Sequence, residues 1–564
     1  MSEEQAVRTL YFGGPILTME EGGRYAEAVL TEGKRILAVG ELKALRQMAG
    51  EGARMKDLKG RTMMPAFIDA HSHFTACANS FLEADLEGAA SFEEIGTRLR
   101  DFIRDRQIPK GHWVRGGKYD QNQLKEGRHP DRAFLDKACP DHPVVISHQS
   151  GHMGVFNTAA LKLLGVTART QAPQGGVIAL EKGEPTGYME ESAFVKWQQE
   201  VPLPSQEDFL EAYQRAQELY LSKGVTTVQE GMMTRQVGRL YGLLLSGNLL
   251  KVDVVAYEDM RESPGLMEEF GEYEDGYRNH FRMGGYKMFL DGSPQGRTAW
   301  LREPYMPAVP ENPREGEGYR GYPVLTDEEV YRNVKTAVLQ GRQLLTHCNG
   351  DAACGQLLAQ CRRVEEETGK LAAIRPVMIH AQLLGLDQLE EVKRLGMIPS
   401  FFAAHVYHWG DVHVKNLGME RAKSISPAAS ALKRQILFTF HQDSPVIQPD
   451  MMETIWCAVC RKTKKDLALG IQERIPVYQA LKAVTINSAY QYFEESSKGS
   501  IRPGKLADLV ILEENPLEAE PERLRQIRVM ETIKEGETVY QVFSSAVFQS
   551  TSKAPSDFKS STRA

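Results

Sequence analysis

Two histidines separated by a single residue, His71 and His73, form the strongest chemical motif in this sequence. They follow an apolar stretch, residues 65–68, that is typical of a short buried strand. In an extended chain, residues two apart project to the same side, so both imidazoles can face one point. Two neutral imidazole nitrogens at one point suit Zn²⁺ or a similar divalent cation. Taken alone, the pair also fits two hydrogen-bonded histidines at the end of a strand.

Other residues that can bind a metal or transfer a proton stand at the ends of further apolar stretches. They are Lys287, His347, His380 and Asp443. A lysine inside an apolar strand, as Lys287 is within residues 285–290, is unfavourable unless it is paired or modified. Each of these residues alone could be a satisfied polar group of the core. Five strand ends each carry a residue of a type that can bind a metal. Together they favour a metal centre over five separate polar residues of the core.

The elements that must position these residues alternate along the middle of the chain. Short apolar runs with strand character are separated by helical patterns, which indicates a parallel sheet with crossover helices. The expected strands are residues 62–68, 225–228, 249–257, 285–290, 343–346, 375–379, 397–402 and 435–440. Eight strands predict a (β/α)8 barrel, a fold whose catalytic residues lie at the carboxyl ends of the strands.

Both ends of the chain have β patterns and are expected to form one small domain. Residues 9–12 and 16–18, the hairpin 28–39, and residues 506–512, 529–533 and 538–542 carry these patterns. We expect a composite β-sandwich from residues 1–62 and 496–548, around a barrel over 63–495. The stretch between His73 and residue 225 is too long for one loop, so it predicts an inserted lid subdomain over about 76–220. Residues 549–564 are polar and are expected to be disordered.

Composition excludes several functional classes. The 564 residues carry a net charge of −7 and give a sequence pI of about 6.1, so there is no basic footprint for nucleic acid or for a membrane surface. Seven scattered cysteines predict free thiols in a reducing compartment, with Cys457 and Cys460 as packing residues. Neither a signal peptide nor a membrane-spanning run is apparent, so we expect a cytoplasmic protein.

Several motifs together resemble the metal-dependent amidohydrolase superfamily, specifically its YtcJ-like branch (amidohydrolase family 3), which includes N-substituted formamide deformylases. The resembling segments are residues 64–73, 282–293, 347–351, 380–382, 443–445 and 499–509. The resemblance covers about residues 8–545. Three positions depart from the pattern of the branch: Ile379 stands where Glu is frequent, Gln442 where Ser is common, and Cys348 where Ala is usual.

The resemblance implies metal-dependent hydrolysis of a non-peptide C–N bond in a small-molecule amide or N-formyl amide. His71, His73, Lys287, His347 and His380 would bind one or two Zn²⁺ ions, or another divalent metal, and Asp443 would serve as the catalytic base. Lys287 would carry a CO₂-derived carbamate, or would remain an unmodified lysine beside a single metal. A deaminase acting on a cyclic amidine and a non-catalytic ligand-binding or regulatory barrel are the alternative functions. The family also suggests a homodimer.

The inserted segment and a later loop hold further candidates. His152 is a candidate substrate-binding residue, with a histidine that fixes an irregular loop as the alternative. Asn157 and Glu191 are expected to brace loops by hydrogen bonding. The histidines that follow the seventh strand are expected to be solvated; they are His405, His408 and His413.

Overall fold

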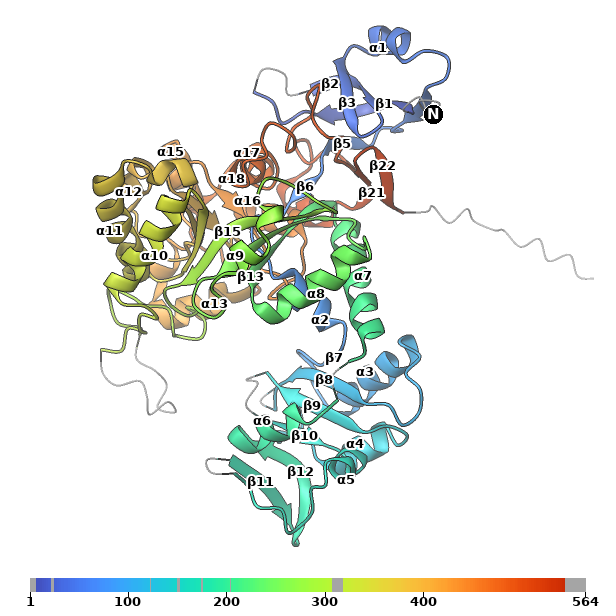
Figure 1. The fold of residues 1–564 in the computed structure, drawn as a ribbon, viewed down its shortest axis with the longest axis vertical. Coiled ribbons are helices and arrows are strands. Elements are labelled where there is room, and N and C mark those ends of the chain that lie inside the picture. Colours follow the sequence, from blue (N-terminus) through green and yellow to red (C-terminus); the bar gives the residue numbers. More distant parts are fainter. Residues whose placement is uncertain are drawn as a thin grey trace, which may run out of the picture.

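The centre of the molecule is a sheet of eight parallel strands that curls into an α/β barrel (Figure 1). The computed structural model describes residues 7–542 except 22–24, 122, 150–152, 174–175, 203 and 307–317. The strands follow the order of the chain and are β6 (Phe67–Ile68), β13 (Val225–Met233), β14 (Asp253–Asp259), β15 (Phe281–Phe289), β16 (Gln343–Cys348), β17 (Val377–His380), β18 (Ile398–Phe401) and β19 (Thr439–Phe440). This arrangement confirms the predicted barrel.

The first and last strands meet just beyond their carboxyl ends. The backbone N–H of His73 donates to the carbonyl of Ser444 at 2.9 Å, and the N–H of Asp443 donates to the carbonyl of His71 at 3.2 Å. The seam of the barrel therefore runs directly through the candidate site.

The predicted first barrel strand, residues 62–68, is divided between two sheets. Its first half, β5 (Thr62–Pro65), pairs with β20 (Leu509–Leu512) in the terminal domain, and only β6 joins the barrel. The N–H of Ala66, between the two halves, donates to the carbonyl of Asp508. One apolar run thus connects the two domains, and the expectation of a single barrel strand was wrong.

Strands from both termini form one hydrogen-bonded sheet of eight strands. Its order is β22-β21-β20-β5-β1-β2-β3, with β4 paired to β1. Apart from β5 and β20, the members are β1 (Arg8–Leu17), β2 (Tyr25–Glu32), β3 (Arg35–Gly40), β4 (Arg54–Asp57), β21 (Val529–Lys534) and β22 (Glu537–Gln541). The two runs expected at residues 9–18 are one strand, β1, with an irregularity between Phe12 and Ile16. That this domain is a sandwich stays a prediction, and the tail 549–564 lies outside the described residues.

The insertion has its own six-stranded sheet and its own cores. The sheet order is β11-β12-β10-β9-β8-β7. The strands are β7 (Ala84–Asp85), β8 (Val114–Tyr119), β9 (Val144–His148), β10 (Met153–Phe156), β11 (Gly176–Glu181) and β12 (Glu184–Glu190). Two clusters of buried apolar side chains within residues 84–201 stabilise it. The flanking helices α2 (Phe74–Ser80) and α7 (Gln206–Ser222) instead pack together and against β13, as parts of the barrel body.

Helices cover the outside of the barrel and complete the smaller domains. In the terminal domain and the insertion they are α1 (Leu42–Ala49), α3 (Phe92–Asp105), α4 (Arg132–Ala138), α5 (Thr158–Leu163) and α6 (Glu191–Gln199). Around the barrel they are α8 (Arg235–Ser246), α9 (Leu266–Glu269), α10 (Asp327–Gln340), α11 (Asp351–Thr368), α12 (Leu389–Arg394), α13 (His405–Leu417), α14 (Met419–Ala422), α15 (Ala428–Lys433), α16 (Met451–Cys460), α17 (Val477–Ala483) and α18 (Ile486–Gln491). Cys457 and Cys460 are buried free thiols on α16, as expected for packing residues. Within the described ranges, no helix has the length and apolarity to cross a bilayer.

A buried ion cluster joins the terminal domain to the amino-terminal face of the barrel. The Oδ2 atom of Asp253, the first residue of β14, lies 2.6 Å from Lys498 Nζ and 2.7 Å from Lys534 Nζ. Its Oδ1 atom lies 2.7 Å from Nδ1 of His280. Burial would raise the pKa of Asp253, but the two lysines hold that pKa well below its ordinary value. Lys498 also pairs with Glu494, and Lys534 also pairs with Asp508, each at 2.8 Å. Because these buried pairs connect the barrel with the terminal domain, the cluster is a structural joint between domains.

Asp253→Asn is expected to lower the free energy of unfolding by about 3–5 kcal/mol, because the substitution leaves two buried lysines with one partner fewer. Denaturant unfolding followed by circular dichroism measures the change. Asp387→Asn is the matched control, since its ion pair with Arg302 at 2.8 Å is largely exposed and such pairs contribute less than about 1 kcal/mol. Equal losses in the two variants would show that the cluster contributes nothing beyond a surface pair.

Candidate metal centre

The described site residues predicted from sequence converge at the carboxyl ends of the barrel strands. His71 and His73 follow β6, Lys287 lies in β15, His347 lies in β16, His380 ends β17, and Asp443 follows β19. His71, Lys287 and His380 are buried. His152 lies outside the described residues.

The carboxylate of Asp443 is at the centre of the group. Its Oδ1 atom lies 3.3 Å from His71 Nε2 and 3.4 Å from His73 Nε2, and its Oδ2 atom lies 3.9 Å from His380 Nε2. The ligand atoms of His71, His73 and Asp443 all lie within 4.8 Å of one another, a spacing that could hold one metal ion.

Lys287 and His347 complete the group, next to His71 and His380 respectively. Lys287 Nζ lies 3.4 Å from His71 Nε2, and Nδ1 of His347 lies 3.1 Å from Nε2 of His380. The site therefore brings together four imidazoles, one amine and one carboxylate from five different strand ends.

The backbone is strained at two of these residues. His380 has a φ of 71° and Asp443 a φ of 54°, in the left-handed region that residues with a side chain rarely adopt. Such conformations cost about 1–3 kcal/mol each and persist where the surrounding structure enforces them. Both side chains are thereby turned toward the common centre.

Burial keeps the histidines in the form that binds metals. Burial first, and then the nearby Lys287, lower the pKa of His71 to about 4 and that of His347 to about 3. Burial also lowers the pKa of Lys287 to about 7, so a neutral amine is accessible. For Asp443, burial would raise the pKa, but the imidazoles of His71 and His73 hold it well below its usual range. Neutral imidazoles around a carboxylate anion form a donor set suited to a divalent cation.

A second layer of polar side chains orients the inner histidines, and sequence reasoning missed it. Gln229 Oε1 lies 2.5 Å from His71 Nδ1, so this nitrogen donates outward and Nε2 is left to face the centre. His441 Nε2 lies 3.1 Å from His380 Nδ1, and His441 Nδ1 lies 2.8 Å from the hydroxyl of Ser400. A partner on the outer ring nitrogen fixes the tautomer and the orientation of a metal-binding histidine. The one available signal was the position of His441 two residues before Asp443.

Gly231 shows how closely the barrel packs around His71. A Cβ atom at this position would lie 2.6 Å from Cε1 of His71. Any side chain there would displace the imidazole, so the site requires glycine at this point of β13.

The histidines after the seventh strand differ from expectation. His405 and His413 are buried on helix α13 and lie 3.1 Å apart, from Nδ1 to Nε2. His408 lies 2.9 Å from Glu453. Because the segment is a helix that packs on the barrel, the predicted solvated loop was wrong. Asn157 does brace a chain segment, because its Oδ1 accepts from the N–H groups of Val144 and Ala160.

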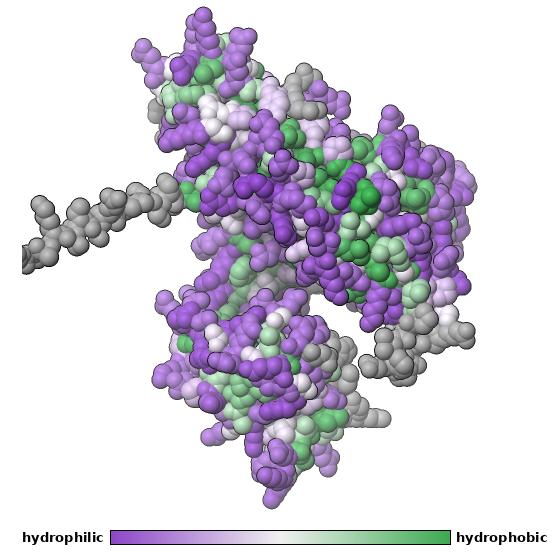
Figure 2. All heavy atoms as spheres, turned by 180° about the vertical axis from the view of Figure 1, so that it is seen from behind, coloured by the Kyte–Doolittle hydropathy of each residue, from purple (hydrophilic) through white to green (hydrophobic). Residues whose placement is uncertain are grey.

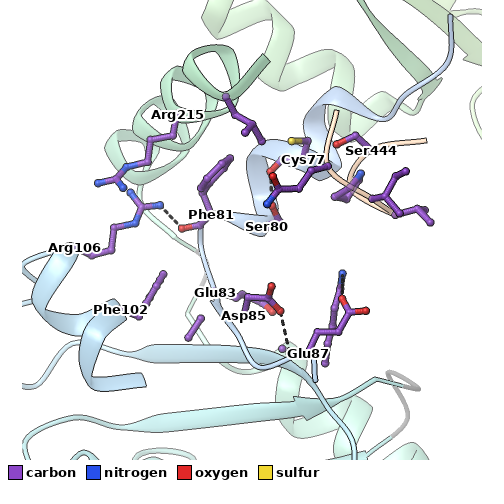
Figure 3. A pocket seen from close by; sticks show the side chains of 18 of the residues that line it. Cys77, Ser80, Phe81, Glu83, Asp85, Glu87, Phe102, Arg106, Arg215 and Ser444 are labelled. Carbon is purple, nitrogen blue, oxygen red and sulfur yellow. Dashed lines mark hydrogen bonds and ion pairs between the residues drawn. The ribbon is translucent and has the colours of Figure 1, made fainter. Parts of the chain in front are cut away.

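The insertion follows His73 and α2 in the chain, and a hollow separates its lobe from the body of the molecule (Figure 2). A cavity of about 460 Å³ lies at the junction of α2, the first residues of the insertion and the loop after Asp443 (Figure 3). Arg106 of the insertion donates to the carbonyl of Phe81 and pairs with Glu211 of α7 at 2.7 Å. That the insertion closes over the mouth stays a prediction.

Comparisons with known proteins agree with this geometry. A model of the amidohydrolase family matches residues 54–540. The YtcJ protein of Bacillus subtilis (strain 168) is 28% identical over 558 residues, which cover 95% of this chain and all of that protein. The N-substituted formamide deformylase of Arthrobacter pascens is 27% identical, over 93% of this chain and 97% of the relative.

A solved structure is similar over a comparable length. An uncharacterized metal-dependent hydrolase from Pyrococcus furiosus superimposes with a TM-score of 0.71 at 27% sequence identity. The match covers 91% of this chain and the whole chain of that hydrolase. A large part of each molecule, including the barrel, therefore shares one fold.

His441→Ala is expected to weaken zinc binding by about 10–100-fold, because it removes the partner of the outer nitrogen of His380. Competition with a chromophoric chelator measures the affinity independently of turnover. His441→Gln should restore part of it, since its amide can accept from the same N–H. His142→Ala, which removes a buried histidine of the insertion, is the control. Unchanged affinity in His441→Ala would refute the orienting role.

Proposed function

The chain belongs to the amidohydrolase family and is a hydrolase, and from this premise we propose that it cleaves the non-peptide C–N bond of an amide. N-formyl amides are the proposed substrate class, since a relative similar over nearly its whole length is named an N-substituted formamide deformylase. The single observation that carries the proposal is the group of imidazoles, amine and carboxylate at the barrel mouth.

We propose that His71, His73, His347 and His380 hold one or two divalent cations, with Zn²⁺ favoured by the imidazole donors. When bound, such a cation lowers the pKa of a water molecule and polarises a substrate carbonyl. The chain supports this assignment because the inner ring nitrogens of His71 and His380 face the centre while their outer nitrogens have protein partners.

Asp443 is the proposed general base. Its carboxylate is ionised and lies among the imidazoles, so it can accept a proton from the attacking water. The same carboxyl group can then donate that proton to the nitrogen of the departing amine. This transfer converts the amine into a good leaving group and returns Asp443 to its anionic form.

Lys287 is the proposed site of a carbamate. A neutral buried amine can attack CO₂ through Nζ and lose a proton, which yields an anionic group with two oxygens. An anion at this position complements cations held by His71 and its neighbours better than a lysine ammonium does. Lys287 also favours amide hydrolysis over the alternative of a deaminase, since a carbamate at this position suits a centre of two cations.

Asp443→Asn is expected to lower kcat/KM for formamides by about 10²–10⁴-fold, the usual contribution of a general base. Metal content, measured by mass spectrometry, should stay close to that of the wild type. Glu420→Gln, at an exposed carboxylate of α14, is the charge-matched control and should keep full activity. If Asp443→Asn retains near-normal turnover, another group takes the proton.

Lys287→Ala is expected to lose one equivalent of metal, because the carbamate oxygens that would bridge two ions are removed. A short-chain carboxylic acid should restore part of the metal content and activity in this variant and leave the wild type unchanged. A wild type that binds one metal, with no CO₂-dependent mass increase on the peptide containing Lys287, would contradict the carbamate.

A further inference from the structure

The outer nitrogen of His71 is bound in a way that leaves its inner nitrogen free for a cation. The amide N–H₂ group of Gln229 donates to the carbonyl of Ala70 and to the hydroxyl of Tyr492, at 2.9 and 2.8 Å. The other end of the amide, Oε1, therefore faces Nδ1 of His71, and that nitrogen must donate. Nε2 of His71 then carries no proton, so it is ready to bind a metal before any metal arrives.

His347 has the opposite arrangement. Its inner nitrogen, Nδ1, faces Nε2 of His380 at 3.1 Å, and its outer nitrogen, Nε2, lies 3.1 Å from Nδ2 of Asn349. The same Nδ2 atom donates to the carbonyl of Gly292 at 3.0 Å. Because a carbonyl oxygen only accepts, this end of the amide is its N–H₂ group, which presents its second N–H to His347. Nε2 of His347 is therefore the bare nitrogen, and its proton is on Nδ1, the atom that faces the centre.

The side chain of Asn349 is enclosed, and its backbone is held in place. The buried carboxylate of Asp291 accepts from the N–H groups of Asn349 and Gly350, at 2.9 and 2.7 Å. Asn349 is itself buried, and within the described part of the chain its Oδ1 atom has no hydrogen-bond partner. Such an unpartnered buried acceptor is uncommon in folded proteins. A half-turn of the amide about its last bond brings this acceptor to the place that Nδ2 now holds, beside His347.

We propose that Asn349 is a positioning residue for His347 and that its amide makes this half-turn when Nδ1 of His347 binds a cation. The inference rests on the proposed function, because it requires a divalent cation among the histidines. On binding, Nδ1 releases its proton to solvent and Nε2 takes one up, so the ring stays neutral. A protonated Nε2 would be repelled by the N–H₂ group of Asn349 at 3.1 Å, but after the half-turn it donates to Oδ1. The carbonyl of Gly292, 3.4 Å from Nε2, loses its amide donor and faces the same N–H.

The first test observes the ring protons directly. Protein that carries ¹⁵N-labelled histidine is compared by NMR in its metal-free and zinc-loaded forms, because bare and protonated ring nitrogens differ widely in ¹⁵N shift. The signals of His347 are assigned by their absence in His347→Gln. Nε2 of His347 should be bare in the metal-free protein and protonated in the zinc-loaded protein. An Nε2 that is already protonated without metal would overturn the proposal.

The second test separates positioning of His347 from support of the fold. Asn349→Leu keeps the size of the side chain but makes no hydrogen bond, and it should weaken zinc binding by about 10–100-fold. Asn349→Asp offers acceptors alone, so Nε2 of His347 is protonated from the start, and its zinc affinity should equal or exceed that of the wild type. Competition with a chromophoric chelator measures both. Asn416→Leu, which removes a buried amide that donates to the carbonyls of Pro294 and Gln295, is the control.

Equal losses of zinc affinity in the two Asn349 variants would refute the positioning role, because a residue that only supports the fold does not distinguish an acceptor from a hydrocarbon. These measurements need no substrate, so they separate this inference from the proposed function. If the variants and the ring protons behave as expected while no amide is hydrolysed, the proposed function fails and the role of Asn349 stands. If amides are hydrolysed but both variants lose zinc equally, the function stands and the role of Asn349 is refuted.

Discussion

The convergence of one partly buried carboxylate and the imidazoles around it is the constraint on which the rest of the site depends. Asp443 follows the last barrel strand, and His71 and His73 follow the first, so their contacts at 3.3 and 3.4 Å span the seam of the barrel. Two backbone hydrogen bonds reinforce the same seam. Closing the barrel and assembling the site are therefore one structural event, and a strand displaced by one residue would turn a ligand away from the centre.

Residues behind the inner group hold this arrangement in place. Gln229 fixes His71, His441 fixes His380, and the absence of a side chain at Gly231 leaves room for the first of these imidazoles. Since metal-binding histidines depend on such partners for their tautomer and orientation, the second layer belongs to the function as much as the inner residues do. The positive φ values of His380 and Asp443 also indicate that the surrounding structure supports the site, because the fold must supply the energy that these conformations cost.

The residues of the inner group could be predicted from the sequence, but the residues that hold them in place could not. Period-two geometry placed His71 and His73 on one side of the chain, and a histidine at the end of an apolar run marked His347 and His380. Gln229 could not be found in this way, because a glutamine in a strand has no distinctive pattern until its partner is known. The division of residues 62–68 between two sheets was equally hidden, since it depends on pairing with β20 about 440 residues later in the chain. His405 and His413 were misjudged because a polar run was read as solvated, although tertiary packing buries one face of the helix.

The ion cluster at Asp253 also bears on how the protein is made. The barrel strand that begins at Asp253 leaves the ribosome before either lysine partner, and Lys534 follows about 280 residues later. At roughly 5–20 residues per second, the carboxylate waits about 15–55 s for its second cation. A barrel that closed before both lysines were present would bury Asp253 with fewer partners than it has in the complete fold, which is unfavourable. The carboxylate at the floor of the barrel therefore gains its lysine partners only when the terminal domain is in place, which couples the stability of the two domains.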